Sequence, residues 1–282
     1  MLLAAFCAAV AQNEGLKVRF LGTGAADWHG VPDERGEYRR LTSILVDDAV
    51  LVDFTPTDED MLPEGCHPEY IFYTHSHGDH YNVMAGLKLG VKHVYCSDTW
   101  ADRCRAEYEK AAAEHGLQAP EVHGLKLQEE VTVCGVTFKA LTGNHYCGKL
   151  NEQALIYLMV KGAKRVLYAT DTAGIPATAA AGGRFGTDGV KKEDRIPLTG
   201  FIMEATVGMG GDENFRLFSH SCVETVLRTV HVLTKTGCYK PAEGQPAYLT
   251  HLARTLHGTQ AELDAGLPKP LKAAYDGLEV IF

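Results

Sequence analysis

The segment at residues 70–80 joins an apolar run directly to a dense set of metal-binding side chains. Its sequence is YIFYTHSHGDH, in which the apolar run predicts a strand and the remainder holds three histidines and one aspartate. Side chains two positions apart share a face, so His75 and His77 can point the same way. Asp79 and His80 follow in the next loop and can turn toward a second point. Imidazole and carboxylate together suit Zn²⁺, Mn²⁺ or iron, so this segment predicts a metal site that can serve two neighbouring cations.

Elsewhere in the chain, apolar strands also end on histidine or aspartate, the residue types predicted to bind metal in the first segment. A hairpin at 130–145 exits at His145, a hairpin at 154–171 ends on Asp171, and a strand at 246–251 ends on His251. Taken singly, these residues could be a loop histidine, a helix N-cap and a core histidine. Layered folds gather their sites at strand ends, and this shared position favours ligands.

The remaining pattern predicts one domain of packed sheets flanked by helices at residues 16–282. Further strands are expected at 16–24, 42–54, 93–97 and 200–208, and a hairpin-like pair is expected at 273–282. Helices are expected at 83–90, 98–115, 220–235 and 257–265.

The HxHxDH motif, followed by strand-end ligands in this order, resembles the metallo-β-lactamase superfamily. The resemblance runs from about Lys17 to the C-terminus and implies an α+β fold, the four-layer αββα sandwich. It also implies two divalent ions, Zn²⁺ or Mn²⁺, and seven ligands. The first ion would be held by His75, His77 and His145, the second by Asp79, His80 and His251, with Asp171 bridging both.

The implied chemistry is hydrolysis without a serine or cysteine nucleophile. Two cations and a bridging carboxylate lower the pKa of a shared water to near neutrality, which produces a hydroxide nucleophile. Asp79 is counted among the catalytic residues as well as the ligands.

Three further stretches resemble one branch of the superfamily. RFLGTGAADW, THLARTLHG and AYDGLEV are similar to segments of the cyclic-phosphate phosphodiesterases of phosphonate breakdown, and the first is also shared with ribonuclease Z. In that group a second histidine follows the LTH ligand and assists the leaving group. Here the nearby residue is Arg254 and the next histidine is His257, while His220 resembles another histidine on the substrate side.

Because of these departures, two different roles in the departure of the leaving group are expected for three residues. His220 or His257 is expected to be the general acid, because a histidine donates a proton near neutral pH. Arg254 is expected to clamp phosphoryl charge, because arginine stays protonated. His220 could instead be an N-terminal helix residue that follows Ser219.

Residues 25–40 form a polar loop without cysteine, so the cysteine-rich zinc lid of some relatives is not expected there. Six residues of this loop are expected to line or cover the cleft: Asp27, Trp28, His29, Arg35, Arg39 and Arg40.

The leading hypothesis for function is a phosphodiesterase acting on a small or cyclic phosphodiester. A lactonase-like or other ester or amide hydrolase on the same site is the enzymatic alternative, and a non-catalytic metal-binding sensor is the third. The net charge of −9 favours a small anionic substrate over extended nucleic acid, because an acidic surface repels a phosphate backbone. A homodimer is left open.

The N-terminal run MLLAAFCAAVAQ ends on an AxA-like pattern but has no basic residue before it. Residues 1–15 are therefore expected to be a signal-like leader or a disordered N-terminus, and cytoplasmic and exported locations both stay open. The run is too short to span a bilayer, so no membrane association is expected. The eight cysteines contain no CxxC pair and do not suggest a disulfide scaffold.

Overall fold

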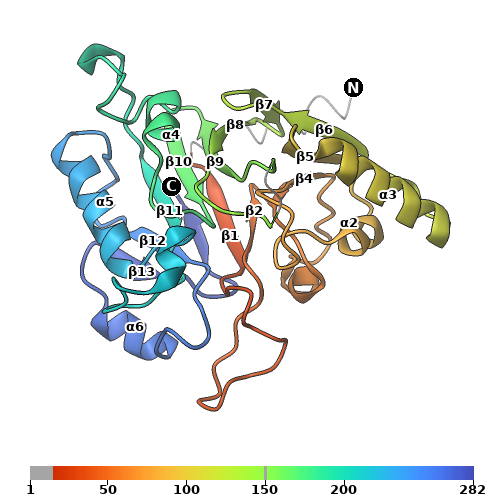
Figure 1. Cartoon of the computed structure of the whole chain (residues 1–282), viewed down its shortest axis with the longest axis horizontal. Helices are drawn as coiled ribbons and strands as arrows, with labels where there is room; N and C mark the ends of the chain where they lie inside the picture. The colour runs from red at the N-terminus through yellow and green to blue at the C-terminus, as the bar shows by residue number, and fades with distance from the viewer. Residues whose placement is uncertain (1–14, 149–150) are drawn as a thin grey trace.

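The computed structural model describes residues 15–148 and 151–282, and it consists of two seven-stranded sheets with helices outside each (Figure 1). The first sheet has the order β14 (Glu279–Ile281), β1 (Lys17–Gly22), β2 (Ser43–Val46), β3 (Val50–Val52), β4 (Tyr70–Phe72), β5 (His93–Ser97), β6 (Glu121–Leu125). The second has the order β13 (Leu271–Ala273), β12 (Ala247–Thr250), β11 (Gly200–Glu204), β10 (Lys164–Ala169), β9 (Leu155–Lys161), β8 (Val136–Thr142), β7 (Glu130–Val133). All but Gly15 of the leader predicted at residues 1–15 lies outside the described residues.

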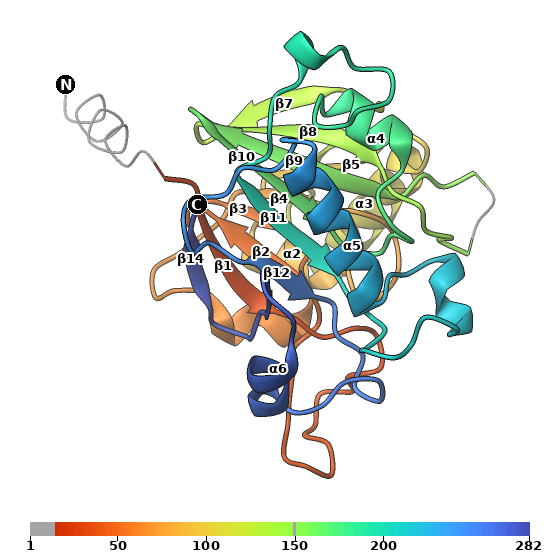
Figure 2. The same cartoon turned by 90° about the vertical axis from the view of Figure 1, so that its left-hand side faces the viewer.

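Helices cover the outer face of each sheet. The first sheet is covered by α2 (Val83–Leu89) and α3 (Ala101–His115), and the second by α4 (Ala177–Gly182) and α5 (Val223–Lys235), with α6 (Gln260–Gly266) against β13. Figure 2 shows α5 lying across the second sheet. Short 3₁₀ helices lie at η1 (Pro56–Met61), η2 (Lys192–Asp194) and η3 (Phe215–Phe218).

Apolar side chains fill all three interfaces between these layers. Phe20 and Phe72 of the first sheet pack with Phe138 and Tyr157 of the second, and each is fully buried. Burying a side chain of this size contributes about 1.5–3 kcal/mol. The outer interfaces are built in the same way, and the predicted αββα sandwich is confirmed.

The helix α5 shows how the sequence specifies the outer layers. Its buried residues are Val223, Val226, Val230 and Leu233, which are spaced by three or four positions and so form one apolar stripe. This stripe packs on the second sheet, and the opposite, polar side of α5 faces outward.

The chain end departs from the expectation of a hairpin-like pair at 273–282. β13 belongs to the second sheet and β14 to the first, so the two strands do not pair with each other. The turn at Gly277, with φ of 89°, carries the chain across, and β14 then pairs antiparallel with β1. The strand β6 was not predicted. Within the described ranges, no helix is long and apolar enough to cross a membrane.

Candidate metal centre

Three histidines converge from two loops. His75 and His77 follow β4 of the first sheet, and His145 follows β8 of the second. His77 Nδ1 lies 3.0 Å from His75 Nε2 and 3.1 Å from His145 Nε2. We call these three residues the first ligand cluster.

A second ligand cluster lies beside it and consists of Asp79, His80 and His251. The Nε2 atom of His80 is 3.3 Å from that of His251 and 3.3 Å from Asp79 Oδ2. The distance from His251 Nε2 to Asp79 Oδ2 is 3.4 Å. Residues 79–80 and residue 251, far apart in the sequence, therefore present three ligand atoms to one point.

Asp171 stands between the two clusters. Its Oδ2 atom is 2.6 Å from His80 Nε2, 3.3 Å from His251 Nε2 and 4.0 Å from His75 Nε2. Its Oδ1 atom is 4.0 Å from the Nδ1 atom of His145. One carboxylate therefore faces members of both clusters, as the bridging assignment requires.

The spacing of these atoms fits divalent metal ions. Ligands about 2.0–2.1 Å from a tetrahedral zinc ion are roughly 3.3 Å apart from one another. The distances within the two clusters are 3.0–3.4 Å. All seven predicted ligands are brought together, although their roles as ligands stay a prediction.

The charges around His80 also fit a cation. Its ring lies within 3.3 Å of three carboxylates, those of Asp53, Asp79 and Asp171. Burial lowers the pKa of His80, but these negative charges raise it well above the usual value. The pKa of His75 is held well below its usual range, mainly by burial, so its imidazole is neutral and available as a ligand. Excess buried negative charge beside neutral imidazole is the environment that a metal ion would neutralise.

Polar side chains behind the ligands fix the orientation of the rings. His80 Nδ1 lies 2.8 Å from Asp53 Oδ2, and His251 Nδ1 lies 2.8 Å from the hydroxyl of Thr206. Thr206 in turn contacts the buried carboxylate of Glu204. Such partners set the tautomer and raise the basicity of metal-binding imidazoles. The sequence analysis identified none of Asp53, Thr206 and Glu204. Asp53 does end a predicted strand, which is the position that the predicted ligands also occupy.

Backbone conformation aims several of these side chains. Asp53, Asp171 and His251 have φ values of 56°, 44° and 53°, in the left-handed region that residues other than glycine rarely adopt. Each costs on the order of 1–3 kcal/mol and persists only where surrounding structure imposes it. All three lie one or two residues beyond a strand end, where this turn directs the side chain into the shared site.

We expect Asp53→Asn to weaken metal binding by about 10–100-fold, the usual cost of losing an outer partner of a metal-binding histidine. The amide preserves the shape of the carboxylate but removes the charge that faces His80. Competition against a metal-binding dye measures this affinity. Asp188→Asn, an exposed change away from both clusters, is the control, and an unchanged affinity in Asp53→Asn would contradict the assignment.

The two clusters open into a cleft of about 320 Å³. The cleft is lined by Ala25, Ala26, Asp27, His77, Asp79, His145, Asp171, Thr206, Arg216, His220, His251 and Ala253. Arg216, in η3, brings a positive charge to this lining. Its guanidinium lies 4.9 Å from the ring centre of Phe215. Sequence reasoning missed Arg216, because nothing in the surrounding residues marks it.

Among the three residues expected to assist the leaving group, His220 lines the cleft. Its Nδ1 atom lies 3.0 Å from Glu204 Oε1 and 3.2 Å from Asp171 Oδ1. His220 precedes α5 and is not part of it, so the interpretation as a helix residue is wrong.

The structure places His257 outside the cleft, which corrects the expectation that it could be the acid. Its Nε2–H donates to the carbonyl of Ala205 over 2.6 Å. Its Nδ1 is buried without a hydrogen-bond partner among the described residues. Burial lowers the pKa of His257 to about 4, so the ring is neutral near pH 7 and has no proton to offer a substrate.

Arg254 also points away from the cleft, and its predicted role as an anion clamp is corrected. Its guanidinium donates to the carbonyl of Pro32 over 3.1 Å and lies 5.6 Å from the ring centre of Trp28. The side chain therefore fastens the 25–40 loop, which extends from the body at the bottom of Figure 1.

The other arginines of that loop are likewise engaged elsewhere. Arg39 is buried and donates to Thr23, Ala274 and Gln260. Arg40 pairs with Asp60, and Arg35 pairs with Asp33. Of the six loop residues expected at the cleft, Asp27 is among its lining.

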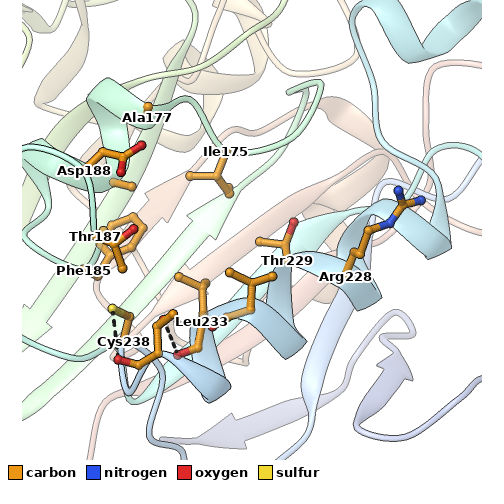
Figure 3. A pocket seen from close by; sticks show the side chains of 13 residues that line it. Ile175, Ala177, Phe185, Thr187, Asp188, Arg228, Thr229, Leu233 and Cys238 are labelled. Carbon is orange, nitrogen blue, oxygen red and sulfur yellow. Dashed lines mark hydrogen bonds between the residues drawn. The ribbon is translucent and has the colours of Figure 1, made fainter.

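A separate hollow of about 340 Å³ lies between α5 and residues 175–188 (Figure 3). Its walls are mainly apolar and include Phe185 and Leu233, with Asp188 and Arg228 as its charged residues. No histidine is among the described residues that line it, and it lacks a convergent ligand set. The candidate site is therefore the cleft over the two clusters.

Comparison with known proteins agrees with this fold. A family model described as a beta-lactamase superfamily domain matches residues 48–187. No curated protein matches the sequence. A diphosphatase from the PhnP family is similar in structure with a TM-score of 0.66 and 20% identity, covering 95% of this chain and 97% of that one.

Two further solved structures are similar over nearly their whole length. Zn²⁺-bound PqqB from Methylobacterium extorquens has a TM-score of 0.64 and 16% identity, with 94% of this chain and 99% of that chain covered. The short form of human tRNase Z has a TM-score of 0.57 and 14% identity, with coverage of 94% and 98%. At these identities the likeness shows a shared fold.

Proposed function

Because this chain has the fold of the metallo-β-lactamase superfamily, we propose that it is a metal-dependent hydrolase that uses two divalent cations to cleave a small phosphodiester. The observation that carries the proposal is the position of Asp171 between two ligand clusters at the floor of a cleft that Arg216 lines. A shared carboxylate suits a pair of ions held close together.

The chain's own residues would divide the work as follows. The first ligand cluster would hold one cation, the second ligand cluster the other, and Asp171 both. When bound, the cations would supply positive charge for phosphate oxygens and acidify a water molecule. Asp53 and Thr206 orient the imidazoles of His80 and His251, so that the site keeps its geometry during the reaction.

The composition of the cleft supports an anionic substrate. Arg216 can form forked hydrogen bonds to two phosphate oxygens. Asp27 also lines the cleft, and its Oδ1 accepts from the backbone N–H of Arg254 over 2.8 Å. A volume of about 320 Å³ suits a small molecule, which supports a small or cyclic phosphodiester. One structural neighbour is a diphosphatase and another is a tRNase.

A substrate panel tests this proposal. We expect metal-loaded protein to hydrolyse bis-p-nitrophenyl phosphate and a cyclic ribose phosphate much faster than a lactone or a β-lactam. Two bound cations, together with Arg216, would stabilise a transition state with more negative charge than an ester hydrolysis develops. Faster turnover of the lactone would favour the lactonase alternative, and no turnover in a fully metallated protein would favour the sensor.

Arg216→Ala is expected to lower kcat/KM for the phosphodiester by roughly 10–100-fold, the cost of one or two hydrogen bonds to a charged group. Arg216→Lys should recover part of the loss, because it restores the charge without the fork. Steady-state kinetics with the metal content checked in parallel measures both. Arg184→Ala, on an exposed arginine that pairs with Asp194, is the matched control. An equal loss on a neutral ester would remove the anion-binding role.

A further inference from the structure

A second group of metal-binding side chains lies on the first sheet, apart from the cleft. β5 and β6 pair in parallel there, with His93 opposite Glu121 and Tyr95 opposite His123. His93 shares a sheet face with Tyr95, two residues on, and Glu121 shares one with His123. The three ligand-type residues therefore stand together on one face at the sheet edge formed by β6.

The ligand atoms of these three side chains form a nearly regular triangle. His93 Nδ1 lies 3.3 Å from His123 Nε2, and Glu121 Oε2 lies 3.5 Å from the first nitrogen and 3.7 Å from the second. The point equidistant from such corners is roughly 2.0 Å from each, which matches zinc–nitrogen and zinc–oxygen bonds. The two imidazole nitrogens are within hydrogen-bond distance of each other, whereas the carboxylate oxygen is too far from either nitrogen for a strong hydrogen bond and stays free to bind a cation.

Aromatic neighbours hold both imidazoles in place. Tyr70 stacks on His93 with 5.1 Å between ring centres and 13° between planes, and Tyr95 stacks on His123 at 4.6 Å and 16°. Rings fixed in advance lose little conformational freedom when a ligand binds. The side chain of Glu121 is 68% exposed and those of the histidines about 30%, so water has access for a fourth coordination position.

We propose that His93, Glu121 and His123 form a surface site for one divalent transition-metal ion of the zinc type, distinct from the catalytic pair. Two imidazoles and one carboxylate are a ligand set that such ions accept, with water completing a tetrahedron. An ion there joins β5 to the edge strand β6 and stabilises that edge, because it binds the folded arrangement and not the unfolded chain. None of the three residues lines the cleft.

The test compares metal content between variants after equilibrium dialysis against Zn²⁺ and removal of loose metal on a desalting column. Glu121→Gln and His123→Ala should each hold one equivalent less than the unaltered protein, with hydrolysis unchanged. His231→Ala, on an exposed histidine of α5, should lose none. Because the result is a difference of one equivalent, it holds even if the cleft binds fewer ions than proposed or catalyses another reaction.

Thermal unfolding gives an independent readout. Zn²⁺ should raise the Tm of the unaltered protein above that of Glu121→Gln, and the difference should vanish with a chelator. Equal zinc content in the unaltered protein and Glu121→Gln, or an equal rise in Tm, would overturn the proposal. Glutamine has the shape of glutamate and the side chain at position 121 is largely exposed, so Glu121→Gln should fold. The test therefore stays decisive even if His123→Ala fails to fold.

Discussion

Asp171→Asn is expected to remove most bound metal and lower hydrolysis by at least about 10³-fold, well beyond the 10–100-fold typical of an outer partner. The carboxylate is fully buried and faces His80 and His251 on one oxygen, with His145 nearer the other. Burial raises the pKa of Asp171, but the neighbouring histidines lower it well below the usual value, so the residue is charged at neutral pH. The amide keeps the shape and loses a charge that both cations would share.

Elemental analysis and kinetics on the same preparation check this expectation. Purified without chelator, the unaltered protein should approach two transition-metal equivalents beyond the one proposed at His93, Glu121 and His123, and the asparagine variant should fall well below. Asparagine tolerates a φ of 44° about as well as aspartate, so backbone strain does not confound the comparison. A fully metallated and fully active variant would show that Asp171 only shapes the turn after β10.

The candidate ligand set could be predicted from the sequence because its members occur in the segments that follow apolar strands. β4, β8, β10 and β12 all end beside the same cleft, so strand-end position, together with the family resemblance, predicted that His75, His145, Asp171 and His251 lie together. The sandwich followed from the same alternation of apolar strands and helices. Both features depend on residues close together in the chain, so they can be recognised without knowledge of the tertiary structure.

The supporting residues could not be read in this way. Thr206 and Glu204 reach His251 and His220 from a neighbouring strand, a relation that depends on the pairing of β11 with β12. Arg216 lies in the four-residue 3₁₀ helix η3, and no local pattern marks it as a cleft residue. The signal for Asp53 was present, but the residue reads equally well as the end of a hairpin.

The errors over His257 and Arg254 have one cause: the family resemblance places a leaving-group residue shortly after His251, and the nearest candidates in the sequence were expected to occupy that place. After His251 the chain turns away, and the backbone N–H of Arg254 is held by Asp27 over 2.8 Å. Neither side chain is among the residues that line the cleft. The expected pairing at 273–282 failed similarly, because a turn with strong hairpin character led into the opposite sheet.

His220 therefore remains the residue expected to protonate the leaving group. It lines the cleft, and its Nδ1 is held 3.0 Å from the buried carboxylate of Glu204, which leaves Nε2 for a substrate oxygen. Its ring stacks on His251 at 5.6 Å with 11° between planes, so its orientation is fixed. Metal-assisted attack alone does not help a basic alkoxide to depart from phosphorus, and a positioned acid contributes about 10²–10⁴-fold to that step.

His220→Ala is accordingly expected to slow hydrolysis of an alkyl phosphodiester by about 10²–10⁴-fold and of the p-nitrophenyl ester far less, because p-nitrophenolate departs without a proton. The two rates are compared on one preparation whose metal content equals that of the unaltered protein. His231→Ala, distant on α5, should change neither rate. The metal content matters because His220 also lies near His145 and Asp171, where it could act as a ligand instead. Loss of metal with equal losses on both esters would identify a ligand, whereas full metal with selective loss on the alkyl ester identifies the acid.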